Sequence, residues 1–146
     1  MEDRNMEAQV WQRVRSAAEE PARNDLRQLR REAMELAAAY RSMIPQFSGR
    51  QQELARQLYL GEKANGRKLT GIGILCRCPE ETLKLWQPGK ESPGKVLERC
   101  YHRTRRCAAE YLARSADPEY GTVFRMMADR EGEHCGIIAE LMGSFG

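Results

Sequence analysis

Four stretches of the chain repeat their apolar residues at alternating spacings of three and four, which places the side chains on one face of an α-helix. The first stretch covers about residues 24–44 and the second about 48–75. The third follows Ser92 and the fourth ends at Gly143. Good helix formers dominate and strand patterns are weak, so the sequence predicts an all-α protein with four long helices.

Residues that favour the start or the end of a helix separate the four stretches. Pro45 ends the first helix, and Ser48 and Gln51 have the spacing of a capping box before the second. Ser92-Pro93 places a cap residue before a proline at the first helical position, and Asp117-Pro118 repeats that start signal. The first pair and the second pair of helices are therefore expected to form two hairpins.

The longest break, "CRCPEETLKLWQPGKESPG", separates the second helix from the third and contains three prolines. It is long enough to cross from one end of a bundle to the other, which predicts a four-helix bundle with one crossover over residues 21–146. Residues 1–20 carry Val10, Trp11 and Val14 on one side. They are expected to form a short amphipathic helix outside the bundle or across one end.

Near its middle, each apolar face is interrupted by a small or polar residue. Because mid-helix positions of neighbouring helices meet at similar depth, Glu62, Asn65, Glu131 and His134 are expected to form one buried polar layer. A buried carboxylate has to pair, take up a proton or bind a metal. The interruptions are Ala33 on the first helix, Glu62 and Asn65 on the second, Thr104 on the third, and Glu131 and His134 on the fourth.

Two interpretations of this layer stay open at this point. Two carboxylates and an imidazole are ligands that suit iron, manganese or zinc. In the metal-free alternative, Glu62 or Glu131 is protonated or pairs with a charged His134, while Asn65 and Thr104 satisfy the remaining polar atoms.

The segments "LRQLRREAMELAAAYRSM", "RQQELARQLYLGEKANGRKLTGIGIL" and "AAEYLARSADPEYGTVFRMMADREGEHCGIIAELMG" resemble the four helices of rubrerythrin-type, ferritin-like proteins. The resemblance covers nearly everything after residue 24. It is most specific in the last third, where Tyr111, "ADPE" and "EGEH" follow the family's order and spacing. It implies a ferritin-like bundle built around a carboxylate-bridged di-iron site.

This chain departs from the family's ligand pattern, which has a Glu seven residues before a Tyr on the first and third helices and Glu-x-x-His on the second and fourth. Ala33 stands seven residues before Tyr40, and Thr104 stands seven before Tyr111. Asn65 replaces the histidine of the second helix. Only the fourth-helix pair is complete.

Glu62, Glu131 and His134 are the ligands that remain. The resemblance then implies a reduced site for one iron or other divalent ion per chain, with Thr104 or water completing it. An enzyme of this kind would be an oxidoreductase acting on oxygen or peroxide, although the family's C-x-x-C electron-transfer module is missing. The residues expected to border the site are Asn65, Thr104, Tyr40 and Tyr111.

A function of another class is a metal-free bundle that serves as an interaction or assembly module, with Trp11 available to cover a partner. Ferritin-like bundles often self-associate, so the resemblance also predicts a homo-oligomer. Net charge is +3, with 24 basic and 21 acidic residues interleaved, and we expect no nucleic-acid partner. No stretch is apolar enough for a membrane span, and we expect no membrane partner.

The five cysteines are an odd number with no signal peptide before them, which favours the cytoplasm and free thiols. Cys100 and Cys107 flank Thr104 and are expected to pack as small core residues, with a thiolate ligand or a redox pair as the alternative. Four polar residues lie off the apolar faces and are expected at the surface: Glu32, Glu35, Glu110 and His102.

Overall fold

The computed structural model describes residues 26–76 and 88–145, and every long element in them is a helix. This confirms the all-α prediction, and the helix limits agree with the sequence pattern to within a few residues. The N-terminal helix predicted for residues 1–20 lies outside the described residues. The elements are a first helix at 26–43, a short 3-10 helix η1 (Ile44–Gln46), α2 (Gly49–Leu75), α3 (Pro93–Ala113) and α4 (Gly121–Gly143).

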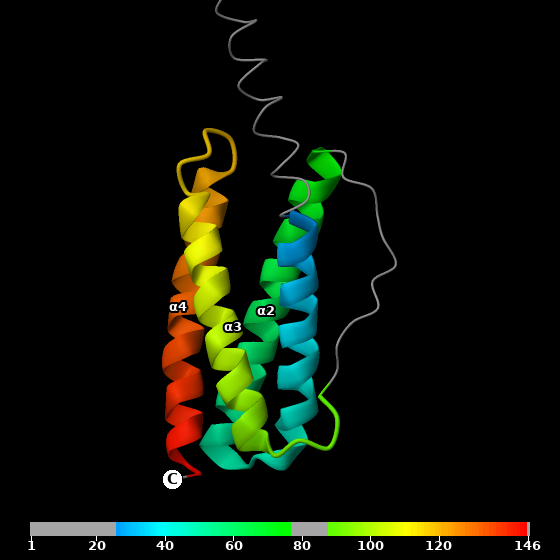
Figure 1. The fold of residues 1–146 in the computed structure, drawn as a ribbon, viewed down its shortest axis with the longest axis vertical. Helices are drawn as coiled ribbons and strands as arrows, with labels where there is room; N and C mark the ends of the chain where they lie inside the picture. Colours follow the sequence, from blue (N-terminus) through cyan, green and yellow to red (C-terminus); the bar gives the residue numbers. More distant parts are fainter. Residues whose placement is uncertain (1–25, 77–87, 146) are drawn as a thin grey trace, which may run out of the picture.

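The four long helices lie side by side as a bundle (Figure 1). The first helix and α2 are joined through η1 at one end of the bundle, whereas α3 and α4 are joined at the other. As a result α2 and α3 run in the same direction, and the end of α2 and the start of α3 lie at opposite ends of the bundle. A bundle with one crossover requires this arrangement. Among the described helices, none combines the length and the apolar character that crossing a bilayer requires.

The two serines expected as caps precede α2 and α3, but neither makes a capping hydrogen bond. Ser48 occupies the position before α2, but its side chain caps nothing, so the predicted capping box is wrong. The side chain of Gln52 stabilises this turn instead. Its amide donates hydrogen bonds to the carbonyls of Ile44 and Phe47, each at 3.1 Å. Before α4, the Asp117 carboxylate accepts two backbone N–H groups at 2.8 Å.

The apolar faces predicted from the sequence form the core. Every position assigned to them is buried, including the polar residues in the middle of the bundle. Burial of apolar surface along the whole length of the helices is what stabilises this arrangement. The largest fully buried apolar side chains are Tyr40, Tyr111, Leu36, Met43, Leu58, Leu69, Leu97, Met127, Ile138 and Leu141.

The prediction that Glu35 faces solvent is wrong. Its side chain is only 8% exposed and accepts a hydrogen bond of 3.3 Å from Arg103 of α3, which also bonds Glu32 at 2.8 Å. Since the first helix lies beside α3, this arginine reaches both carboxylates and offsets the cost of burying Glu35. Glu110 and His102 are exposed, as predicted.

Candidate metal centre

Three potential metal ligands meet in the middle of the bundle. Glu62 comes from α2, and Glu131 and His134 come from α4; one ligand atom from each lies within 4.8 Å of the others. All three residues are buried, with at most 3% of their surface exposed. The imidazole Nδ1 lies 3.6 Å from Glu62 Oε1 and 4.0 Å from Glu131 Oε1. The structure therefore brings together the three residues singled out as ligands.

The local sequence explains how the imidazole reaches this position. Glu131 and His134 are three residues apart and share one face of α4. Opposite them, Gly61 has no side chain, and a Cβ atom built there would overlap His134 Nε2. The ring edge with Nε2 therefore lies against the backbone of α2, and Nδ1 faces the carboxylates.

With both carboxyl groups ionised, several polar atoms of this cluster have no hydrogen-bond partner among the described residues. In proteins, most buried polar atoms form hydrogen bonds. Several unbonded atoms in one place therefore need protons, water molecules or a cation to satisfy them. The three residues together supply two carboxylates and one imidazole, a donor set that divalent transition metals accept. The unpartnered atoms are Glu62 Oε1, Glu62 Oε2, Glu131 Oε2 and His134 Nδ1.

Asn65 orients one of the carboxylates. Its amide nitrogen donates to Glu131 Oε1 at 2.7 Å, and its amide oxygen accepts from Arg130 Nη1 at 2.9 Å. The Asn65 side chain thus holds Glu131 in place. Sequence reasoning missed Arg130, because it lies off the buried face of α4 and only the fold shows that it reaches Asn65.

The other two helices contribute hydroxyl groups to the same layer. Tyr40 Oη and Thr104 Oγ1 lie 3.0 Å apart in a buried hydrogen bond, and the Tyr40 ring meets the His134 ring edge to face. The Tyr111 hydroxyl is buried without a partner among the described residues. Ala33 is buried too and offers no donor. The ionisable groups thus come from α2 and α4, and the neutral ones from the first helix and α3.

Burial controls the charges in the cluster. It raises the pKa of Glu62 to about 7, and burial together with the neighbouring Glu62 raises the pKa of Glu131 well above its ordinary value. Burial lowers the pKa of His134, so the imidazole is neutral at pH 7 and its nitrogen is free to coordinate. Burial also raises the pKa of Cys100 to about 12, so this thiol is protonated in the metal-free protein.

Comparison of the chain with protein-family models, with curated proteins and with solved structures finds no match. The metal-binding interpretation therefore depends on the donor atoms themselves and on their geometry. Two carboxylates, if ionised, would balance the charge of one divalent cation in the core, and a neutral imidazole would complete a set of three protein ligands.

Replacing Gly61 with Ala is expected to displace His134 and to lower the free energy of unfolding by about 1–3 kcal/mol, the usual cost of overpacking. Gly71→Ala is the matched control, because a Cβ atom there meets nothing within 4 Å. In a helix it should stabilise by up to about 1 kcal/mol. Chemical unfolding of both variants measures the difference. Equal effects would contradict the close packing of His134 on Gly61.

Stability of the metal-free protein is expected to fall as pH rises from 5 to 8. The folded state keeps a proton on Glu62 up to a pKa of about 7, above the ordinary value of 4.5, so it holds more protons than the unfolded state. Glu62 alone should cost about 2–3 kcal/mol over this window, and the raised pKa of Glu131 acts in the same direction. His134, whose pKa is lowered, acts in the opposite direction, but only below its ordinary value of about 6.5.

The measurement is urea unfolding at several pH values in the presence of a chelator. Glu62→Gln should reduce the slope of the profile, whereas Glu53→Gln, which changes an exposed carboxylate on the same helix, should leave it unchanged. Stability that rises steadily up to pH 8 in the unaltered protein would show that the buried carboxyl groups are not protonated as described.

Proposed function

We propose that this chain is a reduced ferritin-like metal protein of the rubrerythrin type, in which Glu62, Glu131 and His134 bind one iron-type divalent ion. The observation that carries the proposal is the cluster of buried ligand atoms on three residues, within 4.8 Å of one another. The single crossover and the parallel α2 and α3 support the ferritin-like assignment.

One ion per chain follows from what the remaining positions offer. Ala33 has no donor, and Thr104 is already bonded to Tyr40. Asn65 uses its amide to hold Glu131 and Arg130. A second cation would lack ligands of its own and would be repelled by the first. The chain therefore fits a single-metal centre rather than a coupled pair.

When bound, an iron-type ion would supply redox chemistry toward oxygen or peroxide. The residues of this chain would hold the ion, exclude bulk water and fix the ligand directions. Asn65 would keep Glu131 oriented, and Gly61 would allow His134 to present Nδ1. We place this activity in a cytoplasmic protein that associates with copies of itself.

A metal-free polar network is the competing account, and two observations favour it. Asn65 already satisfies one oxygen of Glu131, and a pKa of about 7 for Glu62 allows the two carboxyl groups to share a proton near neutral pH. In that case the layer only specifies how the helices pack. The bundle would then act as an interaction or assembly module.

Metal-induced stabilisation separates the two accounts. Thermal unfolding is followed with and without Mn²⁺, Zn²⁺ or, anaerobically, Fe²⁺. At a free metal concentration about 100 times the dissociation constant, binding to the folded state adds about 2.7 kcal/mol. His134→Ala should abolish this gain, whereas His102→Ala, which alters the exposed histidine, should retain it. The same metal response in both variants, or none in the unaltered protein, would rule out the proposed site.

A further inference from the structure

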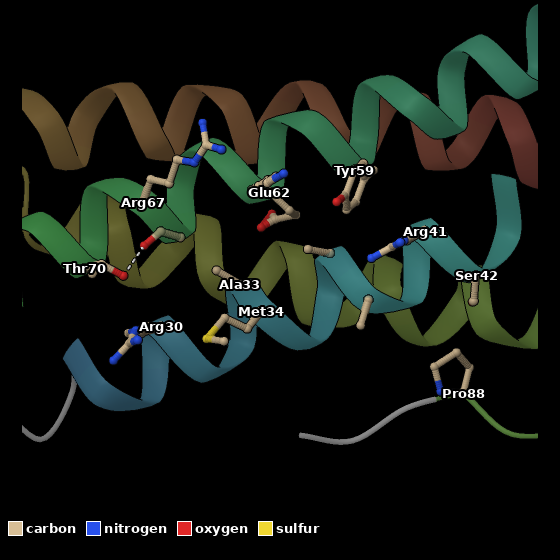
Figure 2. Close-up of a pocket in the computed structure, with 14 residues that line it drawn as sticks. Arg30, Ala33, Met34, Arg41, Ser42, Tyr59, Glu62, Arg67, Thr70 and Pro88 are labelled. Atoms are coloured by element: carbon tan, nitrogen blue, oxygen red, sulfur yellow. Dashed lines mark hydrogen bonds between the residues drawn. The ribbon is translucent and has the colours of Figure 1, made fainter. Parts of the chain in front are cut away.

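A groove of about 760 Å³ lies between the first helix and α2 and reaches the candidate metal centre. Figure 2 shows the two helices with the groove between them. Its floor is made by small and flexible apolar side chains of the first helix, namely Ala33, Met34, Ala37 and Ala38. Gly66 of α2 also lines the groove. Because these five residues are small or flexible, their side chains leave the groove open.

Basic side chains surround this apolar floor. Arg30 and Arg41 come from the first helix, and Lys63 and Arg67 come from α2. Within the described part of the chain, no ion pair joins any of the four to a carboxylate. The Nε atom of Arg30 is buried and has no hydrogen-bond partner there either. Cations around an apolar surface fit a molecule that has both an anionic group and an apolar body.

Glu62 connects the groove to the buried cluster. It is the acidic residue among the described residues that line the groove, and its carboxylate points into the space between the two helices in Figure 2. The residue is only 1% exposed, and both carboxylate oxygens have no partner among the described residues. A ligand in the groove would therefore lie beside the centre.

We propose that this groove binds a small amphipathic organic acid, with its anionic head at the basic rim and its apolar chain along the alanine floor. Arg41 at one end of the groove attracts the head, which leaves the alanine floor to the apolar chain (Figure 2). The apolar chain loses contact with water against Ala37 and Met34.

This inference deepens the proposed function, since it names the class of molecule brought to the Glu62 centre, and for that role it rests on the proposed function. Binding in the groove itself needs no metal. The two proposals can therefore fail separately: a protein that binds metal without binding the acid would refute the groove alone.

The test uses the full metal-free chain and octanoate as the probe, with binding followed by calorimetry and by NMR of the Met34 and Ala37 methyl groups. Octanoate should shift these methyl signals and bind about tenfold or more tightly than 1-octanol, which has the same chain without the charge. Octylammonium, with the opposite charge, should bind more weakly still. Added salt should weaken the binding of octanoate but not of octanol.

Arg41→Glu should weaken octanoate binding about tenfold or more. Arg56→Glu is the matched control, because it makes the same charge change at an exposed position of α2 that does not line the groove. Ala37→Leu should block the floor and weaken both octanoate and octanol. The proposal is overturned if octanoate does not bind, if the three probes bind equally, or if Arg56→Glu has the same effect as Arg41→Glu.

Discussion

Two carboxyl groups and an imidazole lie within 4.8 Å of one another in the core of the bundle, and moving their charges out of water is costly. The surroundings of Glu62 and Glu131 offset this energetic cost only in part. Asn65 bonds one oxygen of Glu131, and burial raises the pKa of both carboxyl groups so that they retain protons near neutral pH. A bound divalent cation would meet the same need by replacing those protons.

Small residues around this cluster determine its shape. Gly61 lets the His134 ring lie against α2, which directs Nδ1 toward the carboxylates. Ala33 and Ala37 leave the groove between the first helix and α2 open as far as Glu62. Between the first helix and α3, the bond between Tyr40 and Thr104 adds neutral hydroxyl groups to the layer. The groove thus reaches the centre at Glu62, while the three ligand residues themselves are buried.

Much of the fold could be predicted from the sequence, because burial in a helical bundle follows the spacing of apolar residues. The polar interruptions at Glu62, Glu131 and His134 were visible for the same reason. The ion pairs of Arg103 with Glu32 and Glu35 were not, since they depend on which helix lies beside which and how far a long side chain reaches. Arg130 was missed because an arginine off the buried face is usually exposed, and here it bonds Asn65.

Metal content tests the central claim most directly. The full chain is produced without a metal-affinity tag in iron-supplemented cells, and the purified protein is analysed for transition metals beside Glu62→Gln and His134→Ala. The account predicts about one metal ion per chain in the unaltered protein and a large loss in both variants. Protein that carries no metal from such cells and takes none up on reconstitution would contradict it.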